Sequence, residues 1–126
     1  MREIKFRAWR IKSELMQFNV QNVIPTVLDP GGSFSDYIQS DDVILMQYTG
    51  LKDKNGVEIY ESDLVLTKEY PYPFEIYYRN ESCQFCLISS NDHIELTAFS
   101  NVNRNYFEVI GNIHENPELL KGERYV

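Results

Sequence analysis

The residues best suited to chemistry in this chain are its two cysteines, Cys83 and Cys86, which have the C-x-x-C spacing. A zinc site needs four ligands, and beyond this pair only His93 and His114 could supply further soft donors. On a strand, residues three apart point to opposite faces, so the two sulfurs would not face one ligand. The sequence therefore favours ordinary reduced cysteines over a metal or redox site.

The histidines and the paired acids give no stronger signal. Each histidine is isolated, and no nucleophile elbow, phosphate loop or H-E-x-x-H motif accompanies it. His114 is expected to fix the passage from the last strand into a terminal helix. The adjacent Asp41 and Asp42 offer oxygen ligands for a hard cation, but the acidic spacing of a calcium loop is missing. We predict no catalytic residue, no metal site and no cofactor, and hence no enzyme.

The first strand offers a possible contact surface for nucleic acid. Lys5, Arg7 and Trp9 alternate along it and share one face. A basic face that carries an aromatic ring is one way in which single-stranded nucleic acid is bound. The alternative is that these cations meet the acidic segment 29–42, either within the chain or across a subunit interface.

A second possible contact surface is the tyrosine- and proline-rich stretch around Tyr70 and Tyr72. Tyr and Pro at a sheet edge resemble the adhesive surface of SH3-type peptide binders, or the self-contact of an oligomer. Other rings of this cluster must fill the core. Tyr78 is expected among them, because it shares a strand face with Phe74 and Ile76.

Composition limits the class of protein. The 126 residues are 43% hydrophobic and 13% aromatic, which is typical of a globular chain of one domain, or of a small barrel with an appendage. The net charge of −7 disfavours general binding to nucleic acid or to membrane surfaces. The charged N-terminal strand is unlike a signal peptide, and no apolar run approaches the roughly 20 residues of a membrane helix, so we expect a cytoplasmic protein.

These features are positioned by predicted strands. Residues 2–11 alternate, with Ile4, Phe6 and Ala8 expected on the core side. A second strand is predicted within residues 15–20, and residues 29–33 are the strongest loop signal. The apolar run 43–46 is expected to be a strand covered on both faces.

The central stretch, residues 47–65, organises the rest of the chain. Asn55-Gly56 predicts a tight hairpin with a primed turn, since Gly takes positive φ at no steric cost. Residues 61–63 form a polar corner before the next strand. Further strands are predicted at residues 74–79, 83–89, 94–99 and 106–113. A short helix is expected from Asn116 through Lys121, with Pro at its first position.

Three stretches together resemble the YopX family of phage and prophage proteins. They are Met46–Gly56 continued by Glu58–Glu61, the N-terminal Met1–Trp9, and the C-terminal Phe107–Leu120. The resemblance implies an SH3-like barrel with an added N-terminal β region, in proteins encoded by phages of Gram-positive bacteria whose activity is not established. Where the family usually has Gly, this chain has Ser62, which must then accept a backbone geometry that Gly adopts more cheaply.

We therefore predict a mainly β protein. Residues 1–45 form an N-terminal β region packed on the barrel, and residues 46–126 form an SH3-like barrel with a short C-terminal helix. The predicted function is that of a non-enzymatic phage accessory protein acting through protein contact or as a homo-oligomer. The alternative is a nucleic-acid-associated protein that binds through the face of Lys5, Arg7 and Trp9.

Overall fold

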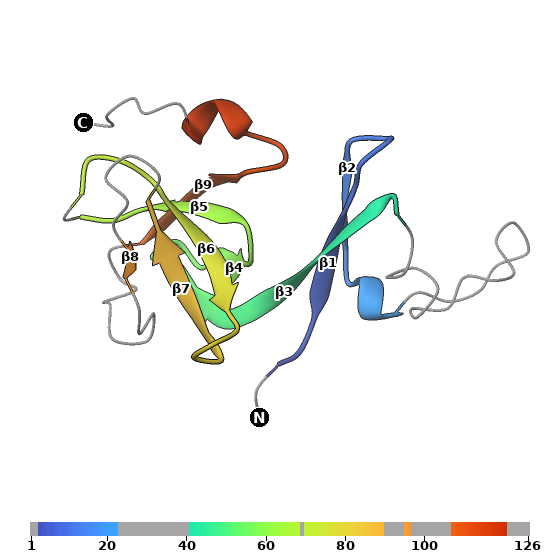
Figure 1. Ribbon diagram of the computed structural model, residues 1–126, viewed down its shortest axis with the longest axis horizontal. Helices are drawn as coiled ribbons and strands as arrows, with labels where there is room; N and C mark the ends of the chain where they lie inside the picture. The colour runs from blue at the N-terminus through green and yellow to red at the C-terminus, as the bar shows by residue number, and fades with distance from the viewer. Residues whose placement is uncertain (1–2, 23–40, 69, 90–94, 97–106, 121–126) are drawn as a thin grey trace, which may run out of the picture. The chain divides into compact units, whose positions relative to one another are not determined.

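The computed structural model describes residues 3–22, 41–68, 70–89, 95–96 and 107–120. It is mainly β, with two antiparallel sheets and almost no helix (Figure 1). The chain divides into two compact units, Met1–Tyr48 and Thr49–Val126. The sequence placed this division between residues 45 and 46.

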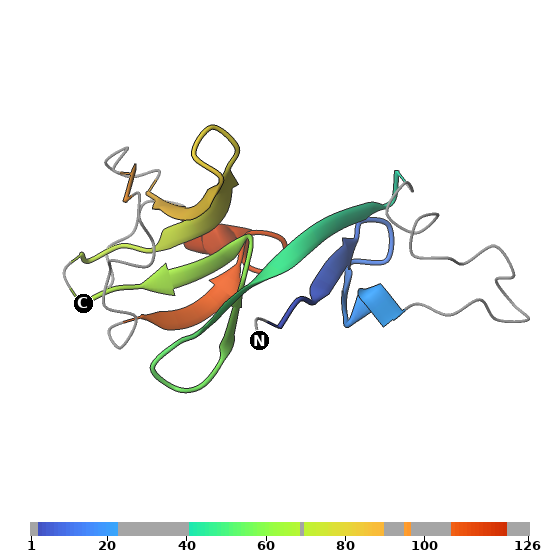
Figure 2. The same ribbon diagram turned by 90° about the horizontal axis from the view of Figure 1, so that it is seen from below.

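The first sheet has the strand order β2-β1-β3-β4. Its strands are β1 (Phe6–Arg10), β2 (Leu15–Phe18), β3 (Val43–Lys52) and β4 (Glu58–Tyr60), and a short 3-10 helix, η1 (Val20–Asn22), follows β2. The longest of them, β3, runs as one strand through the boundary between the two units (Figure 2).

Pairing in the first unit confirms the predicted alternation of β1 but not its predicted core side, since Arg7 is buried and Phe6 only partly buried. Arg7 lies opposite Phe18 of β2 and Met46 of β3, so these three side chains share one face. Trp9 lies opposite Met16 and Ile44 on the same face, and Ala8 is fully buried on the other. The prediction for Ile4 was wrong: it precedes β1 and is 56% exposed, because no paired strand covers it there.

The strand β3 is not covered on both faces as predicted. Met46 and Tyr48 are buried, but Ile44, which lies on the same face, is 38% exposed. On the other face, Val43 and Leu45 are partly buried. A run of four apolar residues was misleading here because coverage changes along the strand, and Ile44 lies near its start.

The hairpin between β3 and β4 forms at the predicted place with a different turn. Of its residues only Gly56 has positive φ, at 81°, whereas a type I′ turn needs two such residues. The Gly56 N–H donates to the Asp53 carbonyl (3.1 Å), and the Asp53 N–H donates to the Val57 carbonyl (2.8 Å). This is the three-residue loop in which a type I turn is followed by a glycine bulge.

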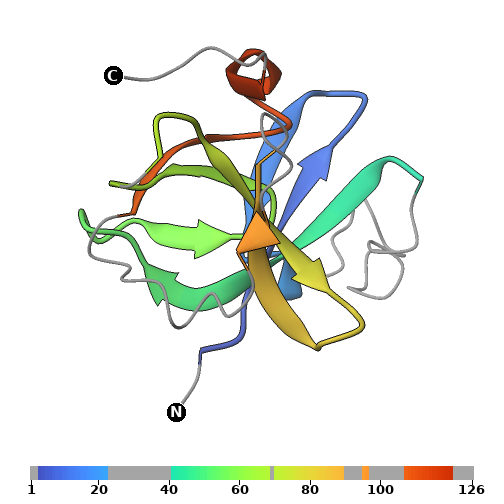
Figure 3. The ribbon, with the colours of Figure 1, turned by 60° about the vertical axis from the view of Figure 1, so that its left-hand side comes forward.

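The second sheet curls through five strands in the order β8-β7-β6-β5-β9 (Figure 3). The strands are β5 (Asp63–Leu66), β6 (Phe74–Arg79), β7 (Gln84–Ile88), β8 (Glu95–Leu96) and β9 (Glu108–Asn112). Register shifts between Leu64 and Val65 where β5 meets β9, and such a bulge increases the local twist of a sheet.

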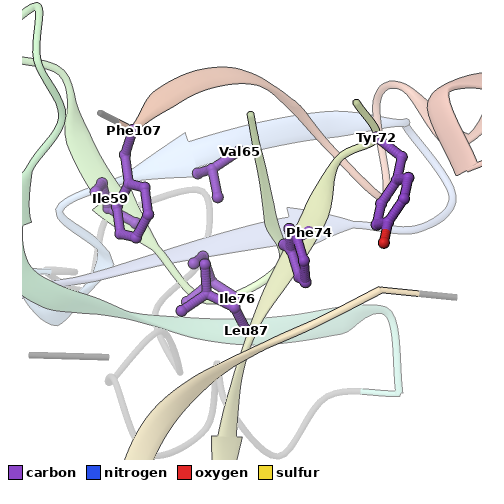
Figure 4. Packing of buried hydrophobic residues seen from close by; sticks show 7 residues of the cluster. All are labelled: Ile59, Val65, Tyr72, Phe74, Ile76, Leu87 and Phe107. Carbon is purple, nitrogen blue, oxygen red and sulfur yellow. The ribbon is translucent and has the colours of Figure 1, made fainter. Parts of the chain in front are cut away.

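The core of the second unit lies on one face of this sheet. Phe74, Ile76 and Leu87 are fully buried there. Figure 4 shows the whole cluster, which consists of Ile59, Val65, Tyr72, Phe74, Ile76, Leu87 and Phe107. Each large apolar side chain buried in this way contributes roughly 1.5–3 kcal/mol to stability.

Tyr78 shares the face of Phe74 and Ile76, but the prediction that it fills the core was wrong. It is 39% exposed and packs edge-on against Phe85, with ring centroids 5.2 Å apart. The physical reason is its place near the end of β6, where the chain reverses and the sheet no longer covers the ring.

The C-terminal helix is reduced to one 3-10 turn, η4 (Pro117–Leu120), and Lys121 lies outside the described residues. Of the predicted strand 94–99, the described residues show only β8. The predicted loop 29–33 and His93 also fall outside them.

Candidate functional site

The most elaborate polar arrangement in the described residues centres on Asp53, which is only 7% exposed. Its Oδ1 accepts the N–H groups of Asn55 (2.8 Å) and Val57 (2.9 Å). Its Oδ2 accepts the N–H of Val109 (2.9 Å), 56 residues away in sequence. The carboxylate therefore shapes the β3–β4 turn and ties it to β9.

The polar corner between β4 and β5 is built by the same means. The Asp63 carboxylate, 2% exposed, accepts the N–H of Tyr60 (2.8 Å). Ser62 has φ of 72°, a left-handed geometry that Gly, the usual residue of the family here, adopts more cheaply. Its backbone N–H donates to Ile76 (2.8 Å) and its carbonyl accepts from Ile113 (3.0 Å), so the corner is fixed from both sides.

The turn after β9 is held by two asparagines. Oδ1 of Asn112 accepts the N–H groups of His114 (3.0 Å) and Glu115 (2.8 Å). Oδ1 of Asn116 accepts the N–H of Asn112 (3.2 Å). His114 thus lies where it was predicted, in the passage from the last strand to η4. Together, these carboxylates and amides accept hydrogen bonds from backbone N–H groups. These bonds leave the side-chain oxygens little capacity to bind a ligand.

The basic strand face is less accessible than its sequence suggested. Arg7 is 5% exposed and the Lys5 side chain is 15% exposed. The Lys5 ammonium lies 5.0 Å from the centroid of the Tyr48 ring, which is within range of a cation–π interaction. Trp9 shares this face and is partly buried. A phosphate would find little surface on Lys5 and Arg7.

Asp42 shows one way in which the acidic segment meets the basic strand within the chain. Its Oδ2 lies 3.1 Å from Nε of Arg10, and its Oδ1 accepts the Lys12 N–H (2.7 Å). The hydrogen bond from the Lys12 N–H is the larger cause, and the Arg10 guanidinium the smaller one, that lowers the pKa of this carboxyl below its usual value. Asp42 therefore fixes the end of β1. Arg10 alternates to the face opposite Lys5, Arg7 and Trp9, so this contact does not test the expected meeting of that face with segment 29–42.

The Tyr and Pro stretch mostly serves the core. Tyr72 is 6% exposed and Tyr70 is partly buried. Their rings pack against Phe74 with centroid distances of 5.8 Å and 5.1 Å, respectively. Pairs at this separation stabilise a fold beyond their buried area. Tyr70 consequently offers a partner more surface than Tyr72 does.

The two cysteines lie in different environments. Cys86 on β7 is fully buried and Cys83, in the preceding turn, is exposed, and both are free thiols. Among the described residues, no three His, Cys, Asp or Glu side chains are placed to hold a metal ion.

The candidate that sequence reasoning missed is the edge strand β2. Leu15 and Phe18 are 58% and 57% exposed. The strand Leu-Met-Gln-Phe carries no charge, although charged residues are a common protection of exposed edges against pairing with other chains. The signal was present in the sequence: residues 15–28 contain no Lys, Arg, Asp or Glu.

Comparison with known families shows which family this chain belongs to. The sequence profile of the YopX protein family matches residues 5–121, nearly the whole chain. The chain belongs to the YopX family. The stretches that carried the resemblance contain Asp53, Ser62 and Asn112 or lie next to them, and these three residues hold turns of this YopX domain.

A solved structure supports the fold. The crystal structure of protein EF1440 from Enterococcus faecalis is 32% identical, with a TM-score of 0.63, and the match covers 96% of this chain and all of that one. A search of curated proteins found no significant match. No helix within the described residues is long and apolar enough to cross a membrane.

Proposed function

We propose that this YopX protein is a non-enzymatic accessory protein of phage or prophage origin that works by contact with another protein chain, and that the exposed edge strand β2 is its contact surface. The observation that carries the proposal is the exposure of Leu15 and Phe18 on a strand without charge at the edge of a sheet. Exposed strands of this kind are templates for β-strand addition.

The polar residues support the same proposal. Asp53, Asp63 and Asn112 are at most 7% exposed, and their side chains are committed to backbone N–H groups. A site that binds or transforms a small molecule needs polar groups directed at the ligand. In the described part of the chain, polar side chains of this kind are mainly hydrogen-bonded to the backbone of its own turns. The phage setting rests on the family resemblance, as does the interpretation of the curled five-stranded sheet as part of an SH3-like barrel.

The test is capture of partners from phage-carrying cells by the tagged full chain, with and without nuclease. Three chains are compared: the wild type, a Leu15→Lys/Phe18→Lys variant, and a Val57→Lys control. Val57 is 46% exposed at the β3–β4 turn, so the control adds a charge at an exposed apolar site that is not part of β2. We expect protein partners that resist nuclease, are lost with the β2 variant and persist with the control.

Two outcomes would contradict the proposal. Recovery that disappears with nuclease would favour binding of nucleic acid, and a steep loss of affinity with added salt would then be expected. Partners captured equally by the wild type and the β2 variant would place the contact elsewhere on the chain.

A further inference from the structure

The turn between β3 and β4 contains Asn55-Gly56, the single Asn-Gly pair of the sequence. Asparagine is among the chemically labile residues of proteins, and a following glycine has no side chain to obstruct attack on the asparagine amide. Asn55 and Gly56 are both exposed. Apart from its chain neighbours, no heavy atom of the described residues lies within 4 Å of the position that a Cβ on Gly56 would take. The two reacting groups therefore have open space around them.

The reaction of this pair needs only water. The Gly56 nitrogen loses its proton and forms a bond to Cγ of Asn55, while the bond from Cγ to the side-chain nitrogen breaks and ammonia leaves. Water then opens the resulting succinimide ring at either of its carbonyl carbons. One product has aspartate at position 55. In the other, isoaspartate, the main chain runs through the former side chain and is longer by one carbon.

The folded turn restrains the attacking nitrogen. The Gly56 N–H donates to the Asp53 carbonyl (3.1 Å), and the N–H groups of Asn55 and Val57 on either side donate to Oδ1 of Asp53 (2.8 Å and 2.9 Å). Because the nitrogen attacks only after losing its proton, it must first give up its hydrogen bond. We therefore expect the reaction in molecules whose turn has opened locally, at a rate set by how often it opens.

The isoaspartate product does not fit the same turn. Hydrogen bonds from Gly56 and Val57 to Asp53, and from the Asp53 N–H to the Val57 carbonyl (2.8 Å), all span the altered bond between residues 55 and 56. An extra main-chain carbon changes the distance between each donor and its acceptor. Asp53 also accepts the N–H of Val109 through Oδ2 (2.9 Å), so its displacement loosens the link to β9.

We propose that Asn55 is a site of spontaneous modification, that the hydrogen bonds of Asp53 set its rate, and that the isoaspartate product releases the turn from β9. The modified chain is then a second chemical form of the protein that lacks the link between residues 53 and 109. This change lies within the second unit and is independent of the contact function of β2.

The rate is measured on the full chain at neutral pH, folded and in urea, by peptide mapping that separates asparagine, aspartate and isoaspartate at position 55. Asn80 is the internal control, because it is exposed in the turn after β6 and is followed by Glu81, whose side chain obstructs the attack. In the folded chain, Asn55 should convert at least about tenfold faster than Asn80, and urea should accelerate its conversion about tenfold or more.

Two variants test the role of Asp53, with circular dichroism to check that each is folded. Asp53→Asn loses the bond to Val109 and should convert about tenfold faster than the wild type when folded. Lys54→Gln removes the exposed ion pair with Glu108 (3.2 Å) and leaves Asp53 in place, so its rate should stay within about twofold of the wild type.

The isoaspartate form is then separated and compared with the wild type by hydrogen exchange at the Val109 amide. It should exchange about tenfold faster or more. Asn55→Asp is the matched control, because it has the charge of the aspartate product on an unaltered main chain and should keep wild-type protection at Val109.

Four outcomes would overturn the proposal. Equal rates at Asn55 and Asn80 in the folded chain would show that Asn55 is not a preferred site. Equal rates at Asn55 with and without urea, or an unchanged rate in Asp53→Asn, would show that the turn does not restrain the reaction. An isoaspartate form with wild-type protection at Val109 would show that the link to β9 survives.

Discussion

Replacing Asp53 by Asn tests whether this carboxylate organises the second unit. An Asn side chain keeps one acceptor oxygen for the N–H groups of Asn55 and Val57, but its amide nitrogen would face the Val109 N–H, which now lies 2.9 Å from Oδ2. The change removes one hydrogen bond to a charged group and leaves a partly buried donor unsatisfied. Hydrogen bonds to charged groups contribute about 1.5–3 kcal/mol each.

We expect Asp53→Asn to lower the free energy of unfolding by about 2–3 kcal/mol, with Asp53→Ala costing about 4 kcal/mol because it removes all three acceptors. For a chain of this size the first loss corresponds to a fall in Tm of roughly 6–12 °C. Urea titration gives the free energy, and hydrogen exchange at the Val109 amide gives a local reading. That amide should exchange faster in the Asn variant than in the wild type.

Asn55→Ala is the matched control, because Asn55 donates to Asp53 through its backbone, and its exposed side chain can be truncated with a change within about 0.5 kcal/mol. The reasoning fails if Asp53→Asn unfolds within about 0.5 kcal/mol of the wild type. It also fails if stability falls while protection of the Val109 amide stays as it was.

Three further changes test other parts of the fold, each by thermal unfolding. Ser62→Gly should raise stability by about 0.5–1 kcal/mol, since it relieves a φ of 72° and keeps both backbone bonds, whereas Ser82→Gly, where φ is not positive, should bring no gain. Gly111→Ala should cost about 1–3 kcal/mol because a Cβ there would lie 2.7 Å from Cγ of Asn116; an unchanged Tm would contradict that close approach. Burial raises the pKa of Glu75, so the ionised carboxylate lowers the stability of the folded chain above that pKa. Glu75→Gln should therefore raise Tm at neutral pH, and the gain should shrink as the pH falls and the wild-type carboxyl becomes protonated. A gain that did not depend on pH would refute this cause.

Most of the secondary structure could be predicted because it depends on local patterns. Alternation along residues 6–10, the turn residues at Asn55-Gly56 and the apolar periods of β6 and β7 are all readable in the sequence. Burial was harder to predict. Tyr78 and Ile4 had the right type and spacing for a core and are exposed, because a side chain is buried only where another element covers it.

The sequence by itself determined the family and the β class, since each follows from residue types in a local order. The positive φ of Ser62 came from the structure. Only the tertiary structure decided what the charged residues do. Asp53 meets Val109 across 56 residues, and Asp42 meets Arg10 across 32. It also showed that Arg7 is buried and that β2 stands at an edge. Such facts depend on which strands become neighbours, and the pairing of distant strands is a property of the whole chain that no short pattern contains.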